Sequence, residues 1–484
     1  MASCLNFGNS GNQMDSGNTK KPSMASIKTR PLERNLALTK LGLGAGTKIV
    51  AHSLINIFRG EVARDSADRD FYSRQAQVLA DELGRLKGSV MKAGQMLSLY
   101  GQYFLPEEAV QVLSELQDDT APVAWAVVAP VLERSIGRQR LAELEVDHAP
   151  LAAASLGQAH RAVRKSDGLA LVVKIQYPGV ADAIDSDIKT LSRLLLMTRL
   201  SPKGLDLAPV FAEVREMLYR EVDYQAEARF TEEFGRRLEG DRRFVVPRVL
   251  REYSSGQVLT TSFEAGISPR DAAVRALPQE RRKHLGAAFI DLFLTEFFDW
   301  GLVQSDPHFG NYRIRAGEGG ADDRIVLLDF GATRRFERRF VEAYRRIVRG
   351  AMHADRMEIL QGAAAIGLMH GSFPDAVLKA FAEMCQLIVE PFNAPDDPRT
   401  PPQLRNSKGD YRWGASDLPM RAANVAARNA LSVHFRVPPR EIVFLHRRLA
   451  GVFIMLAALD VELNARPRLL ASVEQEGGDA PSGG

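Results

Sequence analysis

The chain has 484 residues, which allows several domains and a large hydrophobic core. Its apolar content of 45% and charged content of 25% are ordinary for a globular protein, so collagen-like, coiled-coil and wholly disordered classes are excluded. The 63 basic and 60 acidic residues leave a net charge of only +3, which excludes a nucleic-acid-binding surface spread over the whole molecule.

The two ends of the chain differ in composition from the rest. Residues 1–33 are rich in Ser, Gly, Asn and Lys and lack a signal-peptide pattern, so we predict a disordered lead. Residues 34–140 carry apolar residues at helical spacing and are predicted to be an all-helical extension. Residues 473–484 are small and polar, which predicts a disordered tail. The longest uncharged runs are too short to span a bilayer.

Residues 141–265 change to an α+β pattern. Short β-type runs occur at Leu169–Gln176 and Gln257–Phe263. Long helical stretches are predicted near Ala181–Met197 and Leu207–Arg236. This range is predicted to form one lobe of the protein.

Residues 266–472 are again mostly helical. A helix is predicted over Pro278–Trp300, followed by a β-type pair at Asn311–Arg315 and Arg324–Leu328. The basic stretch Arg334–Arg349 has an apolar stripe, which favours a core helix with a solvated flank over a membrane-contacting helix. The two cysteines, Cys4 and Cys385, exclude a disulfide framework and a zinc site.

Three polar positions follow the order seen in protein kinases. An apolar strand ends in Asp329-Phe330-Gly331, where the acid can hold Mg²⁺ at a strand terminus. Upstream, Asp306 and Asn311 have the spacing of a catalytic-loop Asp and a metal-binding Asn. Lys174 lies inside an apolar strand, where an ammonium group needs a phosphate or a carboxylate partner. Taken alone, Lys174 could equally be an edge-strand lysine that faces water.

Carboxylate partners are available in the predicted helix between Lys174 and Asp306. Asp223 and Glu227 are four residues apart, so they are expected to share one helix face, and Glu221 is offset from them. One helix could thus address two cations. The alternative is a solvated acidic helix face, but apolar residues surround the pattern.

Two further segments suggest specialised roles. Before the lysine strand, Ala152-Ala153-Ala154-Ser155-Leu156-Gly157 stands where a kinase has its glycine-rich loop, and Cβ atoms there limit backbone approach to phosphates. The second segment, Lys92-Ala93-Gly94-Gln95, lies in the helical extension. Alone, it would be interpreted as an exposed Lys and Gln on a helix.

Together these motifs resemble the UbiB/AarF family of atypical protein-kinase-like proteins linked to coenzyme Q biosynthesis. The resemblance covers roughly residues 35–470, with K-x-G-Q at Lys92–Gln95, an alanine-rich loop at Ala152–Gly157 and E-x-D at Glu221 and Asp223. It implies that Lys174 contacts the α- and β-phosphates, with Glu227 as its ion-pair partner. It also implies that Asp306 is the catalytic-loop residue and that Asn311 and Asp329 are Mg²⁺ ligands.

The resemblance implies a protein-kinase-like two-lobed α+β fold with an all-helical N-terminal extension and a mostly helical C-lobe. It implies ATP or ADP and Mg²⁺ as cofactors, ATPase activity, and a tie to isoprenoid quinone precursors or lipids at a membrane surface. The chain departs from typical kinases because Gln304-Ser305 precedes Asp306 and no long activation segment follows Gly331. Within the family pattern, Phe309 replaces an expected Pro.

Two functions remain open at this point. The first is a Mg²⁺-dependent ATPase or small-molecule kinase, and the second is a nucleotide-controlled scaffold that binds a lipid or a partner enzyme. We expect a cytoplasmic protein with peripheral membrane contact and without a nucleic-acid partner, and the oligomeric state stays open. The Lys92 segment is expected to be a lid in which Lys92 pairs with Glu221 or Asp223 and Gln95 hydrogen-bonds nearby.

Overall fold

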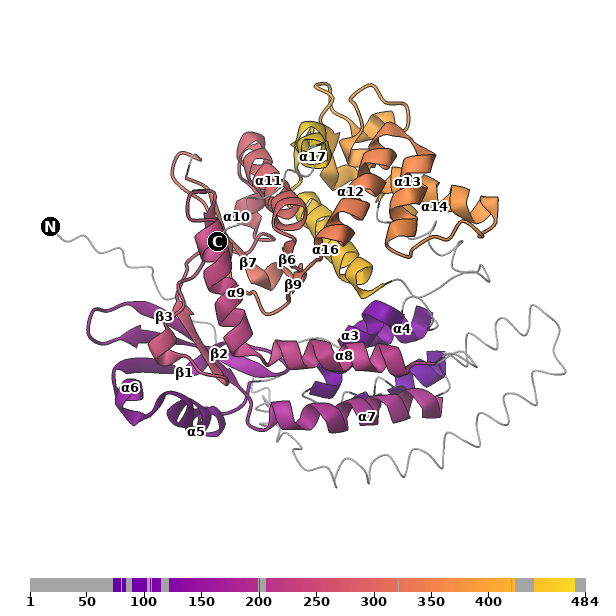
Figure 1. Cartoon of the computed structure of the whole chain (residues 1–484). Coiled ribbons are helices and arrows are strands. Elements are labelled where there is room, and N and C mark those ends of the chain that lie inside the picture. Colours follow the sequence, from indigo (N-terminus) through magenta and orange to yellow (C-terminus); the bar gives the residue numbers. More distant parts are fainter. Residues whose placement is uncertain are drawn as a thin grey trace, which may run out of the picture.

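The structure is a computed structural model, shown in Figure 1. It describes residues 73–474 except 80, 84–88, 102–104, 106, 115–121, 199, 201–205, 321, 419 and 423–438. The predicted disordered lead and all but the first two residues of the predicted tail lie outside the described residues. The described elements form two lobes, each with its own large hydrophobic cluster.

The N-terminal lobe contains an antiparallel sheet with the strand order β1-β2-β3-β5. Its strands are β1 (Leu144–Ala153), β2 (Gly157–Arg164), β3 (Ala170–Gln176) and β5 (Val258–Ser262). In β3, buried Leu171, Val173 and Ile175 alternate with less buried residues, because successive side chains point to opposite faces. Lys174 pairs with β2 on one side and β5 on the other. The alternative of an edge-strand lysine is therefore wrong.

Helices pack beside this sheet, and most of them continue its hydrophobic core. The helices are α3 (Ser89–Gly101), α4 (Glu107–Ser114), α5 (Trp125–Ile136), α6 (Arg138–Ala142), α7 (Val180–Thr198), α8 (Ala208–Glu221) and α9 (Tyr224–Arg237). In α3, the fully buried Val90, Ala93 and Leu97 recur at three-to-four spacing. This stripe packs α3 against both α7 and α8. Helical structure in the described part of the extension is thus confirmed.

The predicted long helix over Leu207–Arg236 is in fact two helices. Helix α8 ends at Glu221, and Asp223 is the N-cap of α9, where its carboxylate accepts the Ala226 N–H at 2.9 Å. The buried Gln176 side chain donates to the Val222 carbonyl, which stabilises the break. The expectation that one helix face presents both Asp223 and Glu227 is wrong, because an aspartate is a strong N-cap residue.

The C-terminal lobe is mostly helical. Its helices are α10 (Ala272–Arg275), α11 (Gln279–Leu294), α12 (Arg338–His353), α13 (Arg356–Ala365), α14 (Asp375–Ile388), α16 (Arg440–Ala458) and α17 (Arg466–Val473). A π-helical turn, η2 (Thr295–Asp299), extends α11. Short 3₁₀ segments are η1 (Arg251–Tyr253), η3 (Phe309–Asn311), η4 (Glu390–Phe392), η5 (Pro402–Leu404) and η6 (Trp413–Ala415).

Small sheets at the junction of the lobes carry the kinase-like motifs. Their strands are β4 (Phe244–Val245), β6 (Leu302–Gln304), β7 (Tyr312–Arg315), β8 (Arg324–Leu327) and β9 (Thr333–Arg335), and a separate pair is β10 (Tyr411–Arg412) with β11 (Glu462–Leu463). Strands β7 and β8 are antiparallel, which confirms the predicted pair, and β4 adds to β8 in parallel. Strand β6 pairs with β9. These pairings bring the ends of β6 and β8 together.

The basic stretch after the Asp-Phe-Gly motif begins as a strand. Arg334 and Arg335 lie in β9, so the predicted helix starts later, at Arg338. Phe340 and Ile347 are buried in the C-terminal core, which supports the core-helix interpretation of this stretch. Across the described ranges, every helix falls short of the length and apolar character needed to cross a bilayer.

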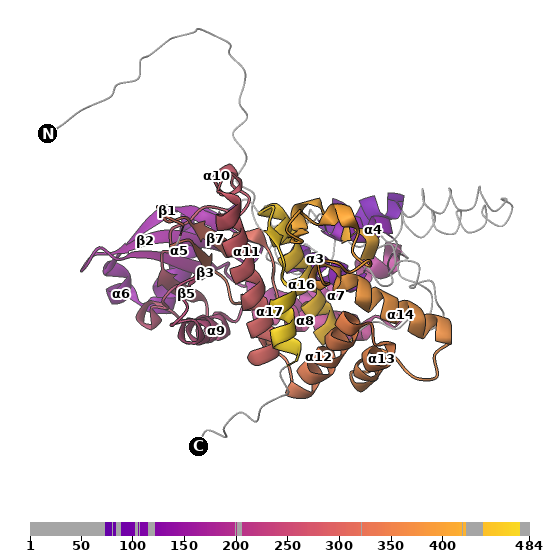
Figure 2. The same ribbon diagram turned by 90° about the horizontal axis from the view of Figure 1, so that it is seen from above.

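Helix α16 joins the two lobes. Its first turn places Val443 and Phe444 in the N-terminal hydrophobic cluster, while Leu445, Val452 and Leu456 belong to the C-terminal cluster. In Figures 1 and 2, α16 runs from the C-terminal helices toward α3 and α8. The position of this helix therefore depends on both cores.

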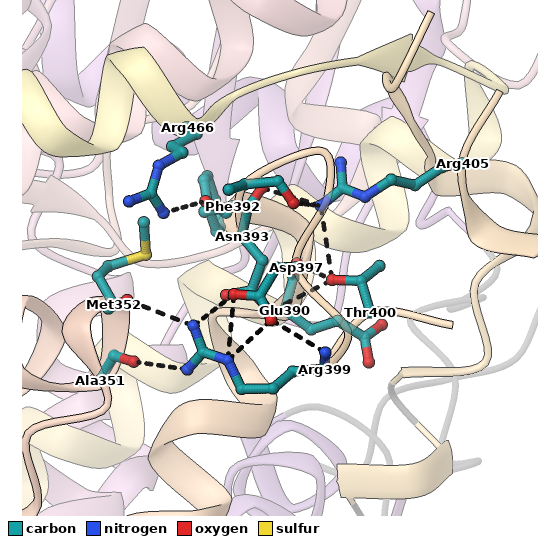
Figure 3. Close-up of polar contacts among 11 residues, drawn as sticks. Ala351, Met352, Glu390, Phe392, Asn393, Asp397, Arg399, Thr400, Arg405 and Arg466 are labelled. Atoms are coloured by element: carbon teal, nitrogen blue, oxygen red, sulfur yellow. Dashed lines mark hydrogen bonds and ion pairs between the residues drawn. The ribbon is translucent and has the colours of Figure 1, made fainter. Parts of the chain in front are cut away.

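Arginines stabilise the largely irregular segment 389–410 of the C-terminal lobe (Figure 3). Arg399 pairs with Asp397 and donates to the carbonyls of Ala351 and Met352 in the last turn of α12. Arg405 donates to main-chain carbonyls of residues 393 and 394 at 2.8 and 2.9 Å. These guanidinium groups add donors to carbonyls at the end of α12 and in the irregular segment, and so join the two.

Candidate functional site

Lys174, Glu227 and Asp329 meet where the two lobes face each other. The Lys174 Nζ lies 2.5 Å from Glu227 Oε1 and 2.8 Å from Asp329 Oδ2. Strand β3 carries the lysine, α9 carries Glu227, and Asp329 follows β8 within the turn that precedes β9. The Phe330 ring is buried against Phe234 of α9, with centroids 4.7 Å apart, which fixes α9 next to the Asp-Phe-Gly turn.

The charges of this triad shift one another's protonation. Burial alone would lower the pKa of Lys174, but the carboxylates of Asp329 and Glu227 outweigh it and raise that pKa. Burial and the nearby Asp329 raise the pKa of Glu227 to about 7, against the opposing effect of Lys174. The pKa of Asp329 is lowered despite burial, because Lys174 and the Gly331 N–H stabilise its charge. Asp329 is therefore the carboxylate that stays ionised here.

Asp306 and Asn311 form the second part of the site. Asp306 follows β6, and Asn311 ends the 3₁₀ turn η3. The Asn311 Nδ2 donates to the Asp306 Oδ2 at 3.0 Å and to its main-chain carbonyl at 3.2 Å. Because Nδ2 faces Asp306, the amide oxygen of Asn311 is the atom that could take a metal ion. His308 contributes to the loop by accepting the Gly310 N–H at its Nδ1, 3.1 Å away.

Arg447 approaches Asp306 from α16, a contact that no sequence motif indicates. Its Nη2 lies 2.7 Å from Asp306 Oδ1, although the two residues are 141 positions apart. Its neighbour Arg448 is fully buried and pairs with Glu296 of η2 at 3.1 Å, and it also donates to the Tyr312 hydroxyl at 2.8 Å. The only sequence signal was an arginine doublet that interrupts an apolar helix.

The departure at Phe309 also has a structural counterpart. The guanidinium carbon of Arg270, which precedes α10, lies 4.1 Å from the centroid of the Phe309 ring. A proline could not supply this cation–π surface. The Phe309 ring thus gives the loop between Asp306 and Asn311 a contact with Arg270.

The alanine-rich loop forms a tight turn between β1 and β2. The Ala154 N–H donates to the Gly157 carbonyl at 2.8 Å. Ala152 and Ala154 are exposed, whereas Ser155 and Gly157 are buried. A Cβ at Gly157 would lie only 2.5 Å from the Ile175 carbonyl oxygen, so glycine is required by this close approach. Nucleotide contact by Ala152, Ala153, Ala154, Ser155 and Gly157 stays a prediction.

The K-x-G-Q segment lies on α3 and meets the end of α8. The Lys92 Nζ is 3.7 Å from Glu221 Oε1, whereas Asp223 caps α9 instead. Burial raises the pKa of Glu221, and Lys92 opposes that rise. The charge of Lys92 also contributes to the lowered pKa of Asp329, so α3 acts electrostatically on the triad. Gln95 lies one helical turn from Lys92, and its main-chain carbonyl accepts the Ser98 hydroxyl at 2.6 Å.

Comparison with known proteins identifies the family. Residues 115–363, just over half of the chain, match the ABC1 atypical kinase-like domain. The chain belongs to the ABC1 atypical kinase-like family. This membership confirms the predicted resemblance, and with it the protein-kinase-like fold. A solved structure of an Mycobacterium tuberculosis protein, Rv3197 in complex with erythromycin, covers 85% of this chain and 98% of its own, with a TM-score of 0.54 and 25% identity.

Several named ABC1 proteins are similar to this chain over most of its length. It is 30% identical over 408 residues to the Schizosaccharomyces pombe protein named atypical kinase COQ8, mitochondrial, covering 84% of this chain and 63% of the relative. It is 31% identical over 445 residues to Caenorhabditis elegans coq-8, covering 89% and 57%. It is also 31% identical over 429 residues to Rattus norvegicus COQ8B, covering 88% and 76%. The chain therefore spans less than two thirds of the first two relatives.

Proposed function

We propose that this ABC1 family protein is a Mg²⁺-dependent atypical kinase or ATPase that supports coenzyme Q metabolism. The observation that carries the proposal is the assembly of Lys174, Glu227 and Asp329 beside the Asp306–Asn311 pair, from elements far apart in the chain. Relatives named COQ8 support the link to coenzyme Q. Kinase-type catalysis needs mainly positioned phosphates and electrostatic stabilisation, which such a cluster can supply.

Lys174 is the residue proposed to hold the nucleotide phosphates. Glu227 orients Lys174 from α9. The short β1–β2 turn belongs to the same sheet, in which β2 pairs directly with β3, the strand that carries Lys174. The exposed Ala152 and Ala154 would face an incoming nucleotide, and their Cβ atoms keep it farther from the backbone than glycine would. This favours a loosely held triphosphate, in contrast to the close cradle of a glycine-rich loop.

The residues at the metal end fit Mg²⁺. In the described part of the chain, three or more His, Cys, Asp and Glu side chains nowhere gather as a metal cage. Mg²⁺ does not need such a cage, because one or two protein oxygens with phosphates and waters complete its shell. The ionised Asp329 and the amide oxygen of Asn311 would be those ligands. The bound ion would neutralise phosphate charge.

The groups packed around Asp306 favour ATP hydrolysis or a small acceptor over protein phosphorylation. One carboxylate oxygen accepts from Arg447 and the other from Asn311. Both oxygens of the catalytic-loop carboxylate are therefore already occupied by side chains of this chain. The Lys92–Glu221 contact also places α3 at the same end of the site. These features support a site that is screened from protein substrates.

The second candidate is a nucleotide-controlled scaffold for a lipid or a partner enzyme. It is favoured by the short link from Asp329 to α12, which leaves no room for a regulated activation segment. In that case nucleotide binding would close one lobe on the other, and no phosphoryl group would be transferred. The two functions predict the same affinity for nucleotide but different turnover.

Phosphate release from the purified protein tests the proposed function. We expect Mg²⁺-dependent release from ATP that increases with liposomes containing anionic lipid or with quinone-precursor mimics. Removal of Mg²⁺ with the chelator EDTA should abolish phosphate release. Tight ATP binding without release under all of these conditions would support the scaffold instead.

Membrane association is proposed to be peripheral. Relatives carry organelle names, such as mitochondrial, and cytoplasmic residence of this chain stays a prediction. Exposed arginines attract anionic headgroups only within a Debye length of roughly 8 Å at physiological salt. We expect flotation with anionic liposomes at low salt and its loss at high salt. Flotation that resists high salt and carbonate would contradict peripheral contact.

Lys92→Ala tests the proposed lid. The substitution removes the cation that lies 3.7 Å from Glu221 but leaves Lys174 and Asp329 in place. We expect nucleotide affinity to change less than about threefold, well under the 1.4 kcal/mol that corresponds to a factor of ten. The site should become accessible and show autophosphorylation, measured by phosphate incorporation. Complete loss of ATP binding would instead make Lys92 a nucleotide ligand.

A further inference from the structure

Arg334 links three elements immediately after the Asp-Phe-Gly turn. It lies on β9, five residues after Asp329, and pairs in register with Val303 of β6, the strand that leads to Asp306. Its side chain leaves β9 toward α8 and α16. The exposed fraction of the side chain is only 10%, which is low for an arginine in a short strand.

The contacts of Arg334 combine an ion pair with aromatic stacking. Its Nη1 lies 3.5 Å from Glu213 Oε1 of α8, and the exposed fraction of the Glu213 side chain is 13%. Its guanidinium carbon lies 3.2 Å from the centroid of the Phe444 ring of α16. A planar guanidinium can pair at its edge and stack with its face at the same time, which a lysine cannot do.

A second arginine strengthens the same junction. Arg440, at the start of α16, approaches Glu213 at 3.6 Å and Glu216 at 3.2 Å. Two acidic residues of α8 thus face cations from β9 and α16. We call the contacts of Arg334 with Glu213 and Phe444 the Arg334 junction. These contacts connect α8 and α16 to the segment that follows the Asp-Phe-Gly motif.

Helix α8 carries the effect of this junction to the proposed lid. Glu213 and Glu221 lie eight residues apart on α8, or roughly 12 Å along a rigid helix. Glu221 is the residue that pairs with Lys92 of α3. A shift of α8 relative to β9 would therefore separate Glu221 from Lys92.

We propose that Arg334 is a positioning residue that holds α8 against the Asp-Phe-Gly segment and so keeps the Lys92–Glu221 contact closed. In this chain the ion pair and the aromatic contact of Arg334 would replace the support that a long activation segment could give. The role of the contact as a lid over the nucleotide site rests on the proposed function. The physical link from Arg334 to α3 does not.

Hydrogen exchange of the α3 amides tests the proposal without nucleotide. In Arg334→Met, which keeps the apolar stem but removes the charge, we expect exchange in residues 89–101 to increase about tenfold, equivalent to about 1.4 kcal/mol of lost protection. Glu213→Gln should produce a similar increase from the other side of the pair. Arg334→Lys, which keeps the charge toward Glu213 but lacks the planar face that stacks on Phe444, should restore only part of the protection.

Arg335→Met is the matched control. Arg335 is the next residue, its side chain is 60% exposed, and it pairs with Glu233 of α9 rather than with α8. Its loss should leave α3 exchange unchanged. The effects of Arg334→Met and Lys92→Ala on α3 exchange should not add up in the double variant, because both substitutions open the same Lys92–Glu221 contact. Equal exchange in Arg334→Met and Arg335→Met, or full additivity with Lys92→Ala, would overturn the proposal.

The thermal unfolding midpoint separates positioning from general damage. If Arg334→Met lowers the midpoint strongly, the milder Glu213→Gln decides. That substitution keeps the size of the side chain and an oxygen that can accept a hydrogen bond from Arg440, and it removes only the negative charge. Glu213→Gln with a normal midpoint and unchanged α3 exchange would contradict the proposal. A wild-type protein that shows the exchange pattern but binds no nucleotide would overturn the proposed function alone.

Discussion

Asp329→Asn is expected to abolish the Mg²⁺-dependent part of nucleotide binding. The substitution removes the carboxylate whose pKa is already lowered by Lys174 and the Gly331 N–H, so a hard anionic oxygen is lost at the metal end. Asn311 would remain as a neutral ligand only. We expect the ratio of ATP affinities with and without Mg²⁺ to fall at least about tenfold, or 1.4 kcal/mol. Titration calorimetry with and without Mg²⁺ measures this ratio.

The control for Asp329→Asn is Asp322→Asn in the turn between β7 and β8. Asp322 is exposed, so this substitution removes the same charge without touching the site. Its Mg²⁺-linked affinity should equal that of the wild type. If Asp329→Asn also retained that affinity, the kinase-like interpretation of the site would be wrong.

Lys174→Met is expected to weaken nucleotide binding and to make stability strongly dependent on pH. The variant leaves Glu227, whose side chain is 5% exposed, and Asp329 facing each other without their cation. Breaking a buried pair costs about 3–5 kcal/mol, and partial exposure of Lys174 reduces this to roughly 2–3 kcal/mol. Chemical denaturation at several pH values measures the loss.

The direction of the pH effect follows from Glu227. Its pKa is about 7 in the folded protein against an ordinary value of 4.5, and loss of Lys174 raises it further. A group with a raised folded pKa adds stability below its unfolded pKa and loses that contribution as pH rises through the folded value. Lys174→Met should therefore be more destabilised, relative to wild type, at about pH 8 than at about pH 5.

Two further variants test the origin of this effect. Adding Glu227→Gln to Lys174→Met should restore stability at high pH, since the unpaired carboxylate is gone, but it should not restore nucleotide binding. Lys165→Met removes an exposed lysine of the neighbouring β-hairpin, whose Nζ contacts only the Ala142 carbonyl among the contacts described for it. It should leave both properties unchanged. A pH-independent loss in Lys174→Met would contradict the role of Glu227.

Much of the site was readable from the sequence because it is encoded in short motifs. A lysine inside an apolar strand needs a counter-charge whatever the rest of the fold, so Lys174 could be singled out before its partner was known. The Asp306–Asn311 interval and the Asp-Phe-Gly turn have fixed local geometries that residue spacing alone conveys. Strand β3, the β7–β8 pair and the core interpretation of α12 also follow from local periodicity.

Tertiary structure decided the contacts between distant elements. The break between α8 and α9 depends on the cap at Asp223 and on Gln176 from another strand, and it sends Glu221 to Lys92 and Glu227 to Lys174. Arg447 reaches Asp306 across 141 residues, and only the packing of α16 against both cores makes that contact. Local propensity and spacing specify which groups carry charge, but pairing between them is set by the packing of apolar faces, which sequence periodicity does not locate in space.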